Sequence, residues 1–264
     1  MTVLEAITSS GIDAREARLL LAEVCGFSQA SLAASPEQDI PFAVENAFFE
    51  LTKKRLNGEP VAYILGRKEF YGLELSVNPS VLIPRPETEL LVDLALERKP
   101  ASMLDLGTGS GAIALAVKFN RPETRVVAVE SDLSALMTAK RNAAKLNLEI
   151  DFRHGRWFQS LAGERFELIV ANPPYVAAGD PHLADLRYEP QSALVSGADG
   201  LEAIKEIVRR VGAFLLPGGW LLLEHGIGQD QAVRELLAAA GLESVASWPD
   251  LAGIARISGG KLKS

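Results

Sequence analysis

From residue 101 onward, the chain alternates between short apolar runs and amphipathic segments. The apolar runs have the length of strands, and helical periodicity lies between most of them. This alternation predicts a parallel, doubly wound α/β sheet, and the short connections near the end favour an antiparallel edge. The expected strands are Ser102–Leu106, Arg125–Glu130, Ile150–His154, Phe166–Ala171, Trp220–Leu223, Glu243–Ser247 and Ile254–Ser258.

The first part of the chain has a different pattern. Asp13 and Glu16 have the spacing of a helix N-cap, and a second helical face begins after Pro41. From Gly66 to Val81 the period changes to two, with Tyr71-Gly72 as a turn, which predicts a hairpin. We therefore expect a helical domain over residues 1–64, a β-hairpin linker over 65–85 and the α/β domain over 86–264.

Composition excludes several classes of protein. Hydrophobic residues make up 48% and charged residues 23% of the chain, which are ordinary values for a folded globular protein. No apolar run approaches the roughly 18 residues of a membrane-spanning helix, and no signal peptide is visible. The formal charge of −7 argues against general nucleic-acid binding. The single Cys25 and three scattered histidines favour a cytoplasmic protein without a metal site.

A glycine-rich loop follows the first strand of the α/β domain and opens a helix. Glycines allow a sharp turn and the close approach of a ligand, and an acid that ends the next strand, Glu130, can accept hydrogen bonds from ribose hydroxyls. The pattern predicts an adenosine-containing cofactor at the carboxyl ends of these two strands. The loop consists of Gly107, Thr108, Gly109, Ser110 and Gly111.

The loop alone leaves the choice of cofactor open. With Ala112 it also fits the dinucleotide pattern Gly-x-Gly-x-x-Ala, so NAD is an alternative. Asp105, two residues before the first glycine, favours S-adenosylmethionine, because a carboxylate suits a cationic methionine group better than a pyrophosphate.

A second motif follows the strand that ends at Ala171. Asn172-Pro173-Pro174-Tyr175 should face the cofactor, because ligands bind outside the carboxyl ends of the strands in open α/β sheets. Two prolines stiffen the loop and leave carbonyl oxygens free, and Asn172 adds a side-chain acceptor. Two fixed acceptors can bind both hydrogens of an –NH₂ group, and Tyr175 offers a flat face for a planar amide or base.

This tetrapeptide resembles the signature of S-adenosylmethionine-dependent methyltransferases that act on amide or exocyclic nitrogens. The chain as a whole is similar to the HemK/PrmC family, which methylates the side-chain N5 of glutamine in the Gly-Gly-Gln motif of peptide chain release factors. The matching blocks occur in the family's order. They are residues 58–66, 70–72, 82–89, 105–111, 155–158, 172–175, 188–190, 193–194 and 197–201.

The resemblance implies a seven-stranded, Rossmann-like methyltransferase domain, a helical N-terminal domain that binds substrate, and a hairpin linker. It implies that S-adenosylmethionine contacts the loop from Gly107 to Gly111, Glu130, Trp157 and Asn172. It also implies that residues 172–175 bind the glutamine, with Asn172, Pro173 and Tyr175 catalytic. The segment before Trp157 and the Glu in place of the more common Asp at 130 depart from the family pattern. No role follows for Arg85 or Glu89.

The expected partners are release factors, without nucleic acid or membrane, and the expected state is a monomer. Three alternatives stay open at this point: a glutamine methyltransferase of a large-subunit ribosomal protein, a DNA or RNA amino-methyltransferase, and an NAD-binding oxidoreductase. A non-catalytic adenosine-binding module is disfavoured by the tetrapeptide. Because no cysteine or histidine lies in the motif, we expect catalysis by positioning and electrostatics, with Asn172 and the Pro173 carbonyl orienting the nitrogen.

Overall fold

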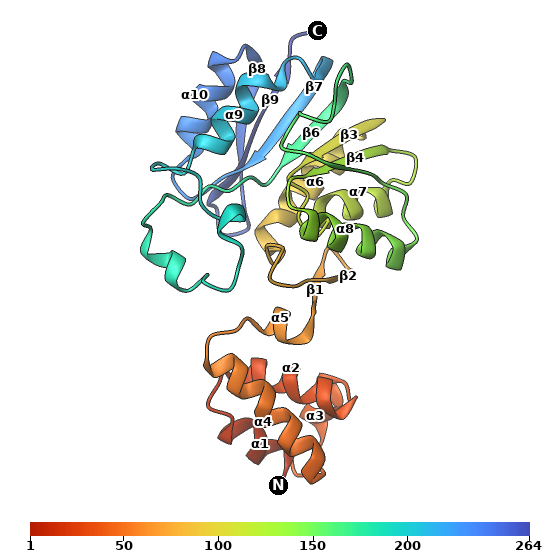
Figure 1. Cartoon of the computed structure of the whole chain (residues 1–264), viewed down its shortest axis with the longest axis vertical. Helices are drawn as coiled ribbons and strands as arrows, with labels where there is room; N and C mark the ends of the chain where they lie inside the picture. Colours follow the sequence, from red (N-terminus) through yellow and green to blue (C-terminus); the bar gives the residue numbers. More distant parts are fainter. The chain divides into compact units, whose positions relative to one another are not determined.

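The computed structural model describes all 264 residues and consists of two compact units, Met1–Arg67 and Lys68–Ser264 (Figure 1). Each unit has its own hydrophobic core. The first unit is helical, and its elements are α1 (Val3–Ser9), α2 (Ala14–Cys25), α3 (Gln29–Ala34), α4 (Phe42–Leu56) and α5 (Val61–Leu65).

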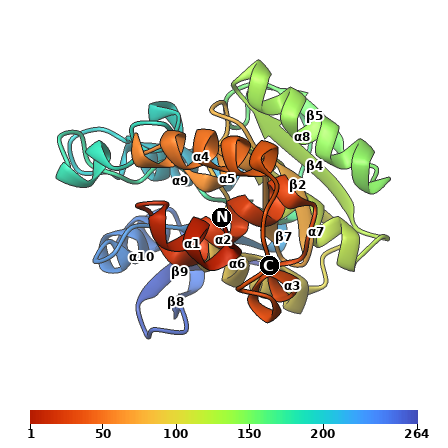
Figure 2. The same cartoon turned by 90° about the horizontal axis from the view of Figure 1, so that it is seen from below.

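The helices of the first unit pack around α2 (Figure 2). The carboxylate of Asp13 accepts hydrogen bonds from the backbone N–H groups of Arg15 and Glu16, so it satisfies two of the free donors at the start of α2. Leu20 and Phe48 are fully buried between the helices. This small core holds the first unit together without the second.

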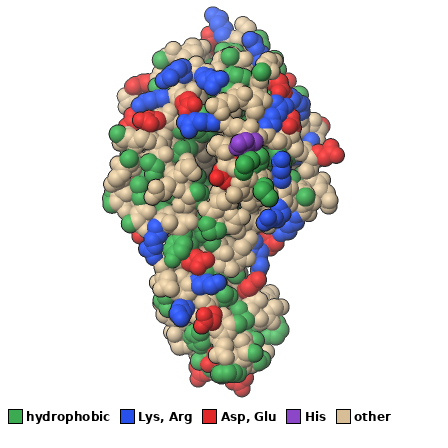
Figure 3. Space-filling view, viewed as in Figure 1, with side chains coloured by type: hydrophobic (Ala, Val, Ile, Leu, Met, Phe, Trp, Pro, Cys, Tyr) green, Lys and Arg blue, Asp and Glu red, His purple; other side chains and the backbone are tan.

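Charged side chains of both signs cover the surface. On the face drawn in Figure 3, Lys and Arg are interspersed with Asp and Glu and do not gather into one continuous basic area. None of the helices combines the length and the apolar stretch needed to cross a membrane.

A hairpin leads into the second unit. Its strands are β1 (Arg67–Phe70) and β2 (Leu73–Ser76), and Tyr71 and Gly72 form the turn with positive φ angles of 51° and 74°. The carboxylate of Glu89 accepts the backbone N–H of Tyr71 at 2.9 Å. Glu89 begins α6 (Glu89–Arg98), so this acid fixes the turn against the helix.

The second unit contains a seven-stranded sheet in the order β5-β4-β3-β6-β7-β9-β8. Five strands are parallel, and β9 runs antiparallel to both of its neighbours. Strands β3 and β6 lie side by side although β4 and β5 separate them in the chain, and this reversal of strand order marks the usual ligand site. The strands are β3 (Ser102–Leu106), β4 (Arg125–Glu130), β5 (Asp151–His154), β6 (Phe166–Ala171), β7 (Leu215–Glu224), β8 (Leu242–Pro249) and β9 (Ala255–Leu262).

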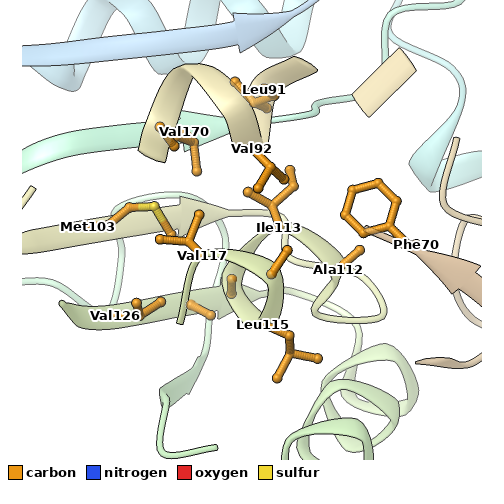
Figure 4. Packing of buried hydrophobic residues seen from close by; sticks show 14 of the residues in the cluster. Phe70, Leu91, Val92, Met103, Ala112, Ile113, Leu115, Val117, Val126 and Val170 are labelled. Carbon is orange, nitrogen blue, oxygen red and sulfur yellow. The ribbon is translucent and has the colours of Figure 1, made fainter. Parts of the chain in front are cut away.

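Helices cover both faces of the sheet. Successive strand residues point to opposite faces, so Met103 packs with α6, α7 (Ala112–Asn120) and α8 (Leu133–Leu146), as Figure 4 shows for part of this core. Its neighbour Leu104 packs on the other face with α9 (Glu202–Val211) and α10 (Asp230–Ala239). Burial on both faces explains the continuous apolar runs of the central strands.

The predicted doubly wound sheet with an antiparallel edge is confirmed. The expected strand Trp220–Leu223 was too short, because β7 begins at Leu215. Pro217, Gly218 and Gly219 have the composition of a turn, but Leu215 pairs with Phe166 across an irregularity in the ladder. Pairing with β6 thus overrides the local turn preference.

Candidate active site

A cavity of about 410 Å³ opens at the carboxyl ends of the central strands. This volume lies in the range of small-molecule sites. Three predicted features meet there, namely the glycine loop after β3, Glu130 at the end of β4 and the tetrapeptide after β6. Further walls come from the segment before α6 and from the segment after the tetrapeptide. The lining residues there are Ser80, Val81, Leu82, Pro84, Arg85 and Thr88, and Pro190, Ser192, Ala193, Val195, Ser196 and Gly197.

The glycine loop has the backbone shape that its sequence predicts. Gly107, Gly109 and Gly111 all have positive φ angles. A Cβ atom at Gly107 would lie 3.3 Å from the ring of Trp157, so the glycine allows the ring to pack on the loop. Gly111 does not line the cavity. It lies against α7, where a Cβ atom at this position would be 3.0 Å from the side chain of Leu115. Its positive φ starts the helix rather than forming the cavity wall.

Asp105 lies beneath the loop and is not part of the cavity wall. Its Oδ2 accepts a hydrogen bond of 2.6 Å from the hydroxyl of Thr108, and its Oδ1 has no partner. Burial raises the pKa of Asp105 to about 7, against the effect of the Thr108 hydrogen bond. The structure therefore shows Asp105 in contact with the loop through Thr108, and a direct role toward a cationic ligand group stays a prediction.

Glu130 faces the cavity and also fastens the loop. One carboxylate oxygen accepts the N–H of Gly109 at 2.9 Å. The other accepts the N–H groups of Ser131 at 2.7 Å and Asp132 at 3.0 Å. The hydroxyl of Ser131 also donates to this second oxygen at 3.3 Å, whereas the first oxygen accepts only from Gly109 and keeps one acceptor position for a ligand hydroxyl.

Trp157 forms another part of the cavity wall, next to Gly107. Its ring packs on Gly107, and its backbone has a φ of 48°, which is uncommon for an aromatic residue. The ring is nearly buried but contributes to the cavity lining. A flat apolar surface at this position suits a planar base.

Asn172 follows the last residue of β6 and lines the cavity with Pro173 and Pro174. Its Nδ2 donates to the hydroxyl of Thr88 at 3.2 Å, while its Oδ1 is shielded from water and has no partner. An unpaired buried acceptor costs about 1–3 kcal/mol of folding free energy. This oxygen is therefore poised to accept an N–H group from a ligand.

Tyr175 is the member of the motif that the structure does not bring to the cavity wall. Its hydroxyl donates to Oε1 of Glu224 at 3.2 Å, and its carbonyl accepts from Nε2 of Gln229 at 3.0 Å. Burial and the neighbouring carboxylate raise the pKa of Tyr175. These contacts anchor the loop, and the flat face expected for a substrate amide is not presented to the cavity.

The structure shows a contact for Arg85, a residue to which the sequence alone assigns no role. It forms an ion pair with Glu189, whose side chain is only 3% exposed and also accepts the N–H of Ile83 at 3.0 Å. Glu189 thus ties the segment before α6 to the segment that follows the tetrapeptide. Both segments form walls of the cavity, so this contact sets its width.

Sequence reasoning missed Thr88, Gln229 and Glu224, which contact the tetrapeptide from three other segments. One signal for Glu224 was available, because an acid follows the apolar run Leu221–Leu223 at the same edge as Asn172. No local pattern distinguishes Thr88 or Gln229 from ordinary helix-end residues.

The structural neighbours are methyltransferases, although their low sequence identity supports the fold alone. A methyltransferase from Pyrococcus furiosus has a TM-score of 0.59 and 18% identity, covering 81% of this chain and 99% of that chain. The human Mettl16 catalytic domain has a TM-score of 0.60 and 17% identity, covering 77% of this chain and 82% of that chain. The sheet, the glycine loop and the tetrapeptide define a methyltransferase of the class that uses S-adenosylmethionine.

Sequence comparisons narrow this class. Residues 86–187 match the family described as methyltransferase small domain, and residues 3–66 match the PrmC N-terminal domain. Release factor glutamine methyltransferases from Burkholderia pseudomallei and Neisseria gonorrhoeae are each 46% identical over 99% of this chain, covering 96% and 98% of those proteins. The relative from Pseudomonas aeruginosa is 48% identical over 93% of this chain and 91% of its own length. The chain belongs to the release factor glutamine methyltransferase family.

Proposed function

We propose that this protein transfers a methyl group from S-adenosylmethionine to the side-chain N5 of the glutamine in the Gly-Gly-Gln motif of release factors. The observation that carries the proposal is the unpartnered Oδ1 of Asn172 in the cavity that also contains the glycine loop. A primary amide offers the N–H donors that such an oxygen needs. The relatives of nearly full length support the same substrate.

The cavity residues suit the cofactor. The loop from Gly107 to Ser110 provides close backbone approach, Glu130 retains an acceptor position for ribose, and Trp157 offers a flat surface for adenine. When bound, S-adenosylmethionine supplies an electrophilic methyl group on a cationic sulfur. Gly111 comes directly before α7 and is not among the residues that line the cavity, so its predicted contact with the cofactor stays a prediction.

Catalysis rests on positioning, because an amide nitrogen is a weak nucleophile. The Oδ1 of Asn172 and the carbonyl of Pro173 accept the two N–H groups and direct the nitrogen lone pair toward the methyl carbon. A methyl group delivered by bound S-adenosylmethionine, which would leave as the neutral thioether, would place positive charge on the nitrogen, and the acceptors of Asn172 and Pro173 would stabilise that charge. The nitrogen then loses one proton to water.

Mass spectrometry tests the function directly. The purified protein is incubated with S-adenosylmethionine and a release factor, and the peptide that contains Gly-Gly-Gln is analysed. We expect one added methyl group on the glutamine and none when that glutamine is replaced by alanine. Parallel reactions with a large-subunit ribosomal protein and with nucleic acid test the alternatives. Methylation of the ribosomal protein or of the nucleic acid, without methylation of the release factor, would contradict the proposal.

A further inference from the structure

Glu224 is a buried acid that follows β7 at the level of Asn172, and the mechanism above does not use it. It is the last residue of β7 and is 2% exposed. Because Leu223 pairs with Ala171 of β6, Glu224 and Asn172 leave the sheet side by side. An acid at such a position has to be held by donors, since burial without partners is costly.

Two hydroxyl groups lie next to this carboxylate. Tyr175 donates to Oε1 at 3.2 Å. Oε2 has no partner of ordinary hydrogen-bond geometry, and the neighbouring hydroxyl of Thr88 interacts with the carboxylate and lowers its pKa. An ionised carboxylate can only accept, so both hydroxyl groups must point their protons toward it.

Thr88 also contacts Asn172, and through this contact Glu224 affects the active site. A threonine hydroxyl has one proton, and if that proton is directed to Glu224, its oxygen can only accept from Asn172. The group of Asn172 that faces Thr88 is accordingly Nδ2, at 3.2 Å. The amide oxygen then points to the opposite side, where it has no partner.

We propose, on the basis of the glutamine methylation proposed above, that Glu224 is a positioning residue that acts through Thr88 to present the oxygen of Asn172 to the substrate amide. Tyr175, held by the same carboxylate, fixes the loop that carries Asn172. With Glu224 ionised, the site offers an acceptor and selects an –NH₂ donor. With Glu224 protonated, the hydroxyl of Thr88 can donate to the side chain of Asn172 instead. The amide of Asn172 can then turn over, so that its N–H groups face the N–H groups of the substrate and no acceptor is offered.

The charge state of Glu224 should therefore control the rate. Burial, together with the nearby charge of Glu87, raises the pKa of Glu224 to about 7 against the opposing effects of the Thr88 and Tyr175 hydroxyls and of Arg256. The active form is the ionised one, so turnover should fall as the pH decreases through about 7 and level off above it. Asp105 has a pKa of about 7 as well, so the part of the acid limb that disappears in Glu224→Gln is the part that Glu224 causes.

The test compares Glu224→Gln and Thr88→Val with a matched control, Glu87→Gln. Glu224→Gln introduces donors into the network, and Thr88→Val removes the hydroxyl while keeping the shape. We expect each to lower kcat by about 10- to 100-fold through misorientation of the amide, with cofactor affinity by calorimetry unchanged. The acid limb should disappear in Glu224→Gln. Glu87→Gln should retain the plateau rate and move the acid limb to lower pH, because a charge that raises the pKa of Glu224 is lost.

The side-chain amide protons of Asn172 provide a second measurement. Their NMR signals should shift with pH near 7 in the wild-type protein and stay constant in Glu224→Gln. Wild-type kcat and pH profile in both Glu224→Gln and Thr88→Val, or an Asn172 signal that does not respond to pH, would overturn the inference. Absence of methylation by the wild-type protein would contradict the proposed function instead, and the NMR titration would still decide the role of Glu224.

Discussion

At the scale of single residues, the site combines an unpaired acceptor with residues that hold it in place. Asn172 keeps an oxygen without a partner, whereas most buried polar groups in proteins are paired. The hydrogen bonds that join the tetrapeptide to Thr88, Glu224 and Gln229 prevent it from relaxing to satisfy this oxygen. The unpaired oxygen of Asn172 lowers the free energy of unfolding, but it leaves an acceptor available for a substrate amide.

Replacing Asn172 by alanine tests this interpretation. Turnover should fall by about 100-fold or more, the scale for loss of one oriented polar group, while cofactor affinity stays within roughly tenfold. The free energy of unfolding should change by less than about 1 kcal/mol, because loss of the Thr88 hydrogen bond is offset by removal of an unpaired oxygen. Single-turnover kinetics, calorimetry and urea unfolding measure the three effects.

Asn120→Ala is the matched control, because Asn120 is exposed at the end of α7 and bonds only to the helix backbone. It should leave turnover unchanged. Full activity in Asn172→Ala, or equal losses in the two variants, would show that the Asn172 amide does not orient the substrate.

At the scale of elements, the carboxyl ends of β3, β4, β6 and β7 gather the site, and the loops between them are fastened by close contacts. Gly200 shows how tight one of these contacts is. Its φ is 75°, and a Cβ atom there would lie 2.2 Å from the carbonyl oxygen of Tyr175. The glycine thus lets the segment before α9 pass directly behind the tetrapeptide.

Gly200→Ala should therefore damage both stability and activity. We expect the free energy of unfolding to fall by about 1–3 kcal/mol, since an unfavourable φ and a steric overlap act together. Turnover should also fall, because the overlap displaces Tyr175. Chemical denaturation and methyl-transfer rates measure these effects.

Gly212→Ala provides the control for a glycine near the other end of α9. Its φ is −58°, and nothing lies within 4 Å of a Cβ built there. This change should leave the protein as stable or raise its stability by up to about 1 kcal/mol. Similar effects of the two substitutions would show that Gly200 has no special packing role.

At the scale of the whole molecule, the two units have separate cores. The first core contains residues from Val3 to Leu65 only, and the cofactor site lies entirely within Lys68–Ser264. The smaller unit contributes no residue to the cavity. Its part in the reaction is therefore expected to concern the protein substrate and not the cofactor.

A protein of residues 67–264 should separate these roles. We expect it to bind S-adenosylmethionine within about threefold of the full chain, because the residues that line the cavity are all retained, and to lose methylation of intact release factor. Calorimetry and mass spectrometry measure the two properties, with circular dichroism as the check on folding. Undiminished methylation of the release factor would contradict a substrate-binding role for residues 1–66.

Much of this molecule follows from local patterns. The period of the apolar residues and the turn residues predict the sheet, the helices and the hairpin, because these patterns act over a few neighbouring positions. The glycine loop, Glu130 and the tetrapeptide were identified for the same reason, since each has its own chemistry and its own place after a strand. Cofactor class and motif residues thus depend on short segments.

Only the tertiary structure decided what lies behind these motifs. In the structure, Asp105 is hydrogen-bonded to Thr108 of the loop and Tyr175 lies outside the cavity wall. Glu224 lies next to both Thr88 and Tyr175. These residues are separated by up to 136 positions from Thr88 to Glu224 in the chain. Sheet order brings them together, and burial sets their charge, so no local pattern could determine which way the amide of Asn172 points.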